Sequence, residues 1–366
     1  WGGGVLLGLA GIVAGVTGVV LTVASRTQHG SGSLYRTLKR RSELESGPRI
    51  VAIGGGTGLS TLLRGFKRIS ANLTAIVAVT DDGGSSGRLR EEYDVPAPGD
   101  LRNCLVALAP EEERLSEVVS YRFSEGEELE GHSLGNLLLT ALSDINGGFA
   151  EGIRECSEVL NVQGRVLPSM LGTPELQAGL PDGRTVVGET TIADAEGIPE
   201  TLSIGEGPVE PNPEAIASVI DSDCIVVGPG SLYTSILTNF LEPELCRAIT
   251  RSPAPKVYVS NLMTEAGETE GYSVADHLEK FREIPPEPIE FDYVIVNTRQ
   301  APERLLEEYR EEGSEQVVFD YDRVKDFHCE LLTGNFMSIG EHLRHDIQRL
   351  TDEIQGIINR EAMKEP

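Results

Sequence analysis

The chain alternates short runs of apolar, β-forming residues with stretches whose apolar positions recur every three or four residues. The runs that predict strands are Ile50–Ile53, Leu73–Val79, Cys224–Val227, Lys256–Ser260, Tyr293–Asn297 and Gln316–Phe319. The stretches that predict amphipathic helices are Leu59–Arg68, Leu134–Ile145, Pro213–Ile220, Val274–Phe281 and Pro302–Glu312. Strands that alternate with helices in this way predict an α/β fold, with a mostly parallel sheet and helices on both of its faces.

The region from 162 to 204 interrupts this alternation. It contains short β-rich runs at Arg165–Met170 and Thr185–Gly188, and the turn-forming sequence Pro181–Gly183 lies between them. We expect a small β-rich insertion here, which would serve as a flap or as a contact in a homo-oligomer. A final amphipathic helix is predicted at Thr351–Arg360, in a C-terminal segment (346–366) that follows a ligand-binding domain spanning 48–345.

The N-terminal segment differs from the rest because residues 1–25 carry no charged side chain. Val5–Ala24 is long enough to span a bilayer, and Arg26 starts a polar, basic stretch (26–47) that predicts a linker. The positive-inside rule then predicts a transmembrane anchor that tethers a cytoplasmic domain to the inner face of the membrane. A cleaved signal peptide is disfavoured since the basic residues follow the apolar run. A loose glycine-rich tail is the other alternative.

Charge excludes one class of partner. The formal net charge is −27, whereas binding to a nucleic-acid backbone needs clustered Lys and Arg. A phosphorylated small molecule is still compatible, because a few backbone N–H groups can hold it locally. The five cysteines form no CxxC pair and are scattered through apolar segments, which indicates reduced, buried thiols rather than a disulfide framework or a zinc site.

A glycine-rich loop follows the first predicted strand and precedes a predicted helix. Its residues are Gly54, Gly55, Gly56, Thr57 and Gly58. A strand, a glycine turn and a helix direct backbone N–H groups and a helix N-terminus toward a phosphate, so this loop is a candidate ligand site. A plain tight turn is the alternative. The loop lacks both the dinucleotide fingerprint and the lysine of a Walker loop, which argues against an NAD-dependent oxidoreductase.

An acidic turn follows the second predicted strand and is expected at the same edge of the sheet. Asp81 and Asp82 are the candidate catalytic residues and the candidate ligands for a magnesium ion, a ribose hydroxyl or a substrate hydroxyl. Ser85, Ser86 and Arg88 are candidates to hold phosphate. The alternative is a solvated turn with an Asx cap.

Two further motifs carry polar residues at predicted helix starts. Asp100 would cap a helix, and Arg102 and Asn103 in its first turn are candidates to face a ligand. Asn136 lies in an apolar helix start, where asparagine is unfavourable, and this indicates a specific hydrogen bond. His132 is either an acid–base or ligand contact, or a structural histidine.

A second strand–turn–helix loop resembles the first. Gly228 and Gly230 end a buried strand, and Ser231 opens the next helix, where it is either part of an anion site or an ordinary N-cap. Asn261 follows another predicted strand and would line the same crevice. Tyr272 either stacks on a base or packs against the helix that follows it.

These motifs, in this order, resemble the bacterial gluconeogenesis factor family, which is related to the 2-phospho-L-lactate transferase of deazaflavin coenzyme biosynthesis. The resemblance covers roughly Pro48–Gly340 and rests on six segments: GGGTGLS at 54–60, VTDDGGSSGRLR at 79–90, PGDLRN at 98–103, GHSLGN at 131–136, GPGSLYTS at 228–235 and SNLMTEAGETEGYS at 260–273. It implies a Rossmann-like fold. The N-terminal apolar segment is a departure from the soluble members.

The resemblance implies two functions. The transferase branch moves a phospholactyl group from a nucleotide diphosphate donor to a flavin-like alcohol, with magnesium. The gluconeogenesis factor branch binds UDP-N-acetylglucosamine and supports cell shape and wall synthesis on gluconeogenic carbon sources, without an established reaction; SSGRLR and GETEGY favour this branch. By motif match, Gly54–Gly58 and Gly228–Ser231 would hold phosphate, Asp81 and Asp82 would form the acidic loop, Asn136 would contact the ligand in the crevice, and Tyr272 would contact the nucleotide.

Overall fold

The computed structural model describes residues 39–93, 95–126, 128–205, 207 and 209–364. The chain divides into two compact units, Trp1–Gly47 and Pro48–Pro366. In the first unit residues 39–45 are helical, and the anchor predicted for residues 1–25 lies outside the described residues. Among the residues that are described, no helix is both long enough and apolar enough to cross a membrane.

The second unit is built on a seven-stranded sheet in which every neighbouring pair of strands is parallel, as the sequence predicts. In order across the sheet, the strands are β12 (Glu330–Gly334), β11 (Tyr293–Asn297), β10 (Lys256–Val259), β9 (Cys224–Val227), β1 (Ile50–Gly54), β2 (Leu73–Val77) and β3 (Arg165–Pro168). Ile50 pairs with Leu73 on one side and with Cys224 on the other. The central strands are buried on both faces, which explains their continuous apolar sequences.

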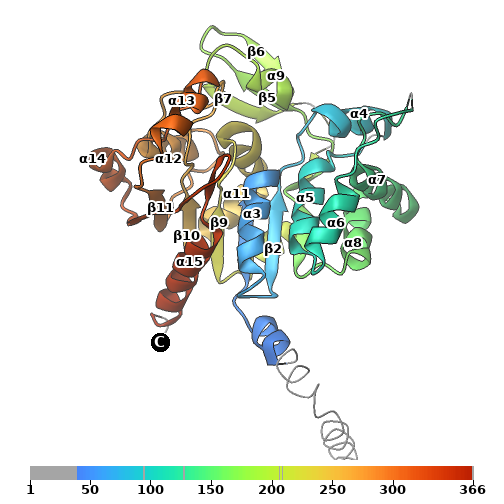
Figure 1. The fold of residues 1–366 in the computed structure, drawn as a ribbon, viewed down its shortest axis with the longest axis horizontal. Helices are drawn as coiled ribbons and strands as arrows, with labels where there is room; N and C mark the ends of the chain where they lie inside the picture. Colours follow the sequence, from blue (N-terminus) through green and yellow to red (C-terminus); the bar gives the residue numbers. More distant parts are fainter. Residues whose placement is uncertain (1–38, 94, 127, 206, 208, 365–366) are drawn as a thin grey trace, which may run out of the picture. The chain divides into compact units, whose positions relative to one another are not determined.

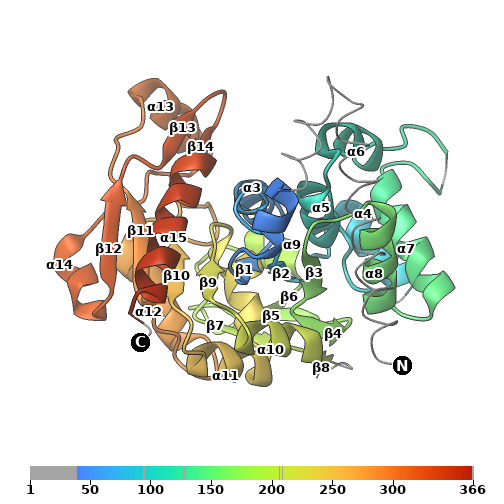
Figure 2. The same cartoon turned by 90° about the horizontal axis from the view of Figure 1, so that it is seen from below.

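Helices cover both faces of the sheet, because alternate residues of each strand point to opposite sides (Figure 2). The side chains of Ile50 and Ala52 belong to one core, and those of Val51 and Ile53 belong to the other. The first core is covered by α3 (Gly56–Phe66), α5 (Gly99–Leu108), α8 (Phe149–Val159) and α15 (Ile347–Ala362), with α6 (Glu112–Val119) and α7 (Leu134–Asn146) beside them. The second is covered by α10 (Pro213–Ile220), η1 (Leu232–Ile236), η2 (Leu237–Phe240), α11 (Pro243–Arg251) and α12 (Val274–Glu283).

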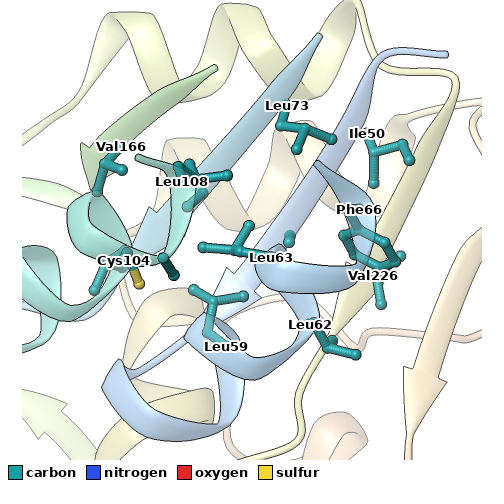
Figure 3. Packing of buried hydrophobic residues seen from close by; sticks show 14 of the residues in the cluster. Ile50, Leu59, Leu62, Leu63, Phe66, Leu73, Cys104, Leu108, Val166 and Val226 are labelled. Atoms are coloured by element: carbon teal, nitrogen blue, oxygen red, sulfur yellow. The ribbon is translucent and has the colours of Figure 1, made fainter. Parts of the chain in front are cut away.

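Helix α3 shows how the amphipathic pattern places an element. Leu59, Leu62, Leu63 and Phe66 are completely buried and lie on one face of the helix, against the apolar side chains of the sheet (Figure 3). This apolar stripe fixes the rotation of α3. The opposite face of the helix therefore points away from the sheet.

The insertion forms small antiparallel sheets at the carboxyl edge of the main sheet (Figure 1). Its elements are β4 (Met170–Gly172) paired with β8 (Val209–Pro211), and β5 (Leu176–Gly179) between β6 (Thr185–Val187) and β7 (Thr201–Ile204), with helix α9 (Glu189–Ala193). The remaining elements are α4 (Gly84–Tyr93), α13 (Glu303–Glu311), α14 (Tyr321–Val324), η3 (Lys325–Phe327) and the hairpin β13 (Met337–Ile339) with β14 (Leu343–His345).

Two strand predictions are wrong. The run Arg165–Met170 was expected inside the insertion, but Arg165–Pro168 is strand β3 at the edge of the main sheet. Gln316–Phe319 makes only isolated bridges, and the strand at the opposite edge is β12. Both edge strands are partly exposed, so they lack the continuous apolar run that marks the central strands.

Candidate functional site

The strand order reverses between β1 and β9, which are neighbours in the sheet. The chain runs outward from β1 to β2 and β3 on one side, and from β9 to β10, β11 and β12 on the other. At such a switch point the loops after the two strands diverge and leave a crevice at the carboxyl edge. The loops here are Gly54–Gly58 and Gly228–Ser231, so the two glycine loops of the sequence meet at this point.

The two loops pack directly against each other. A side-chain carbon at Gly58 would overlap the backbone carbonyl oxygen of Pro229, so only glycine fits there. Asn261, which follows β10, fixes the second loop. Its side-chain oxygen accepts a hydrogen bond from the backbone nitrogen of Gly230 (3.4 Å), and its side-chain nitrogen donates to the backbone oxygen of Gly230 (2.9 Å).

A cavity of about 450 Å³ opens where these loops meet. Of the sequence-predicted residues, it is lined by Thr57, Gly58, Arg102, Asn103, Gly230 and Asn261. Its other walls come from the outer face of α3 and from α5, α6, α13 and β14. The segments that form it are far apart in the sequence, and the parallel sheet brings them to one edge.

The cavity is cationic although the protein as a whole is strongly acidic. Arg64, Arg102 and Arg344 line it, together with His345, and none of the described residues that line it is Asp or Glu. The Nε2 atom of His345 lies 3.1 Å from the backbone oxygen of Ser260. Burial lowers the pKa of His345 to about 4, so its imidazole is neutral at physiological pH.

The three arginines differ in their partners. Arg64 forms an ion pair with Glu112 of α6. Arg102 and Arg344 have no carboxylate within 4.0 Å among the described residues. Burial lowers the pKa of Arg102, and the nearby Arg122 lowers it further, while Asp100 acts in the opposite direction. Arg102 is therefore a half-buried cation without a paired carboxylate in the described part of the chain.

The backbone at the N-terminus of α3 is already hydrogen-bonded to a carboxylate of the protein itself. Asp100 accepts a hydrogen bond from the backbone of Gly56, and a side-chain carbon at Gly56 would overlap this carboxylate. Burial raises the pKa of Asp100 to about 6, and the charge of Asp81 adds to this increase. Gly55 lies against Ser235 in the same way, and the carbonyl of Gly54 accepts from Asn239. Close packing of protein atoms thus accounts for much of the glycine content of this loop.

The acidic turn after β2 faces the insertion. Asp81 accepts a hydrogen bond from the backbone of Gly83 (2.9 Å). One oxygen of Asp82, Oδ1, accepts from both the backbone nitrogen (2.9 Å) and the hydroxyl (2.7 Å) of Thr190 in α9. Within the described residues, no group of three or more His, Cys, Asp or Glu side chains is arranged to hold a metal ion. Asp82 therefore connects the turn to the insertion.

Helix α9 also adds a carboxylate to this edge of the sheet. Burial raises the pKa of Glu189 to about 9, and the charges of Asp81 and Asp100 contribute. Glu268 is buried as well, and its pKa is raised to about 7 by burial and by Glu265. Burial and like charge both penalise ionisation, so Glu189 is protonated at neutral pH, whereas the pKa of Glu268 lies close to neutral pH.

Polar residues from three motifs form one buried network. The Ser85 hydroxyl lies 3.0 Å from Nδ1 of His132 and accepts from the amide nitrogen of Asn136 (3.1 Å). Arg102 donates to the side-chain oxygens of Asn136 (2.8 Å) and Asn103 (2.8 Å). Burial lowers the pKa of His132, so its imidazole is neutral at pH 7. Among these side chains, only Arg102 and Asn103 line the cavity.

The remaining predicted residues lie around the cavity rather than on it. Ser86 is buried near Gly99, and Arg88 is exposed and donates to the backbone oxygen of Glu130 (2.7 Å). The Ser231 hydroxyl donates to Glu265 (2.9 Å). Gly228 donates its N–H to the carbonyl of Ile53 (3.0 Å), and the Tyr272 hydroxyl lies 2.7 Å from that of Tyr233. None of these residues lines the cavity.

Sequence reasoning did not single out Arg64, Arg344, His345, Glu189 or Glu268. Arg64 lies on the outer face of α3, and the sequence pattern of this helix indicated only its buried apolar face. Arg344 and His345 are in strand β14, which no sequence pattern indicated. Glu189 is carried to the site by the insertion, whose fold depends on antiparallel pairing between distant short strands.

The fold and the cavity define a Rossmann-like α/β protein with a cationic cavity at the switch point of its sheet. The chain belongs to the family described as 2-phospho-L-lactate transferase CofD, whose model matches residues 50–337. This membership confirms the family resemblance that the six sequence motifs indicate.

Named relatives extend this result. The chain is 41% identical over 304 residues to the gluconeogenesis factor of Bacillus subtilis, and the match covers 83% of this chain and 96% of that protein. It is 42% identical over 306 residues to the gluconeogenesis factor of Halalkalibacterium halodurans, covering 83% and 95%. A crystal structure of a Bacillus halodurans protein matches with a TM-score of 0.81 and 41% identity, covering 85% of this chain and 100% of that one. The Rossmann-like fold is thus confirmed.

Proposed function

We propose that this protein is a gluconeogenesis factor that binds a nucleotide-linked sugar, UDP-N-acetylglucosamine, in the cavity at the switch point. In this proposal it acts as a binding protein that supports cell shape and wall synthesis during growth on gluconeogenic carbon sources. The observation that carries the proposal is a cavity whose lining, in the part of the chain that the structure describes, includes three arginines and no acidic residue, although the net charge of the chain is −27.

The charge pattern favours a diphosphate. A half-buried guanidinium without a carboxylate partner is costly, and a bound anion would offset that cost. Arginine also pairs with phosphate through two parallel hydrogen bonds, which makes it the usual residue for phosphate recognition. Arg102 and Arg344 come from α5 and β14, so a diphosphate placed between them would be held from two sides.

The rest of the cavity suits the nucleoside and the sugar. Val106, Leu262, Met263 and Leu343 supply apolar surface, while Thr57 and Asn103 supply hydrogen-bonding groups. A volume of about 450 Å³ lies within the range of pockets that bury small-molecule ligands.

A second candidate function is a magnesium-dependent transferase of the phospholactyl type. The observation that favours it is the group of carboxylates with raised pKa values, Asp100, Glu189 and Glu268, since such groups are common at catalytic sites. In this reading Asp81 or Asp82 would orient the metal or accept the proton of the acceptor hydroxyl.

Calorimetric titration of the full chain with UDP-N-acetylglucosamine tests the favoured function. We expect saturable binding that weakens as salt is added, because charge drives it. The absence of heat with any UDP-sugar would overturn the proposal. Turnover of a phospholactyl nucleotide with a deazaflavin alcohol, in the presence of magnesium, would establish the transferase instead.

A further inference from the structure

Three helices bring their polar side chains together behind the cavity. Ser85 is in the first turn of α4, Asn136 is in the first turn of α7, and Arg102 is in α5. These helices lie side by side (Figures 1 and 2). Ser85 and Asn136 are almost completely buried, whereas Arg102 reaches the cavity. The network therefore has an interior end and an end at the cavity.

The hydrogen bonds of the network run in one direction. Nη1 of Arg102 donates to Oδ1 of Asn136, and Nδ2 of Asn136 donates to the hydroxyl of Ser85. The proton of this hydroxyl is then available to Nδ1 of His132, 3.0 Å away. If the Asn136 amide were flipped, its NH₂ group would face the N–H groups of Arg102, and this would be repulsive. Arg102 therefore fixes which end of the amide faces it, and Ser85 holds the other end.

Arg102 keeps part of its hydrogen-bonding capacity. Nη1 donates to Ser133 (2.7 Å) and Asn136 (2.8 Å), and Nη2 donates to Asn103 (2.8 Å). A guanidinium has five N–H donors, so the Nε–H and one N–H on Nη2 have no partner among the residues that the structure describes. All three acceptors are neutral, so these hydrogen bonds orient Arg102 without pairing its charge, and the carboxylates of Asp100 and Asp81 act on it only through longer-range charge.

We propose that Arg102 binds a phosphate of the ligand in this cavity, and that Asn136 is the positioning residue that orients Arg102. The proposal rests on the proposed function only in placing an anion in the cavity, and it names no nucleoside or sugar. A neutral amide suits this role because it accepts from the guanidinium and leaves the charge available. An aspartate at position 136 would accept from Arg102 equally well but would cancel that charge.

The difference between asparagine and aspartate makes the proposal testable. We expect Asn136→Asp in the full chain to weaken the binding of inorganic pyrophosphate at least about tenfold, measured by calorimetry in metal-free buffer. The matched control is Asn146→Asp, which adds the same charge at the exposed C-terminal end of the same helix. That control is expected to bind pyrophosphate within about twofold of the unmodified chain.

A purely structural role for Asn136 predicts a different outcome. If the residue only stabilised the start of α7, Asn136→Asp would lower the melting temperature while the folded protein kept its pyrophosphate affinity, and this result would overturn the proposal. Arg102→Lys keeps the charge but loses the oriented fork, so we expect it to weaken binding also. Ser85→Ala releases the amide of Asn136 without adding charge, and it is expected to give an intermediate loss.

The outcomes separate this proposal from the proposed function. If the unmodified chain binds no pyrophosphate, or if Asn136→Asp binds it as tightly as the unmodified chain, the role of Arg102 and Asn136 is overturned. If pyrophosphate binds and depends on Asn136 while UDP-N-acetylglucosamine gives no heat, the phosphate site is supported and the nucleotide-sugar function fails.

Discussion

Gly58 in the first glycine loop lies directly against the backbone carbonyl of Pro229 in the second. This contact joins the loops that follow β1 and β9 and forms one wall of the cavity. The two loops therefore form one structural unit, because the backbone position of each loop depends on that of the other.

The contact predicts that Gly58→Ala is destabilising. The added methyl group would overlap a backbone atom that cannot move aside alone, so we expect a loss of about 1–3 kcal/mol in the free energy of unfolding. The matched control is Gly356→Ala in α15, where an added side-chain carbon meets nothing within 4 Å. That substitution should stabilise by about 0.5–1 kcal/mol. Equal effects of the two substitutions in urea unfolding would contradict the tight loop contact.

The insertion is expected to depend on Asp82. Because Asp82 accepts two hydrogen bonds from Thr190, Asp82→Ala should release α9 from the acidic turn. The effect on stability is expected to be about 0.5–2 kcal/mol, as for the loss of a helix cap. Hydrogen exchange should accelerate in α9 and in β5, β6 and β7. Unchanged exchange there, with Glu196→Ala as the control on an exposed residue of the same insertion, would show that Asp82 does not hold it.

Glu189 predicts a pH dependence of stability. Its pKa is about 9 in the folded chain against an ordinary value of 4.5, so the folded state holds a proton that the unfolded chain releases. Stability is therefore expected to fall as the pH rises through that window, by about 1–2 kcal/mol between pH 7 and pH 9. Glu189→Gln should flatten this slope, whereas Glu196→Gln should leave it unchanged. If the Glu189→Gln variant kept the slope of the unmodified chain, the assignment would be refuted.

A substitution at Arg344 tests whether the ligand binds in this cavity. It is exposed on β14, so Arg344→Glu should fold normally and lower the affinity for UDP-N-acetylglucosamine by about tenfold or more. Arg251→Glu makes the same charge change on α11, on the opposite side of the sheet, and serves as the control. If both variants bind alike in calorimetry, the ligand does not reach β14.

The sequence predicted the centre of the fold better than its edges. Strands β1, β2, β9, β10 and β11 are buried on both faces and read as continuous apolar runs, so their positions were visible in the pattern. Strands β3 and β12 are half-exposed: the run at Arg165–Met170 was recognised but assigned to the insertion, and Glu330–Gly334 was not recognised as a strand. Parallel topology then placed the glycine loops, the acidic turn and Asn261 at one carboxyl edge, because each of them follows a strand of the same sheet.

Only the parts of the site that lie in local sequence motifs could be predicted. The glycine loops, Asn103 and Asn261 were predicted as ligand contacts, and all of them contribute residues to the cavity wall. The division between the cavity and the network behind it could not be predicted, since it depends on how α4, α5 and α7 pack. Arg344 reaches the cavity from a segment with no local signal, and the charges of Asp81 and Asp100 act on Glu189 only because the insertion folds back onto this edge of the sheet, so only the tertiary structure reveals both residues.

The central claim is that a nucleotide-linked sugar binds in the cavity between the two glycine loops. Hydrogen exchange of the full chain, with and without saturating UDP-N-acetylglucosamine, tests it most directly because it reports where the ligand acts. We predict protection at the start of α3, in α5, in the loop Gly228–Ser231 and in β14. Protection confined to other elements, or no change on adding the ligand, would contradict the account.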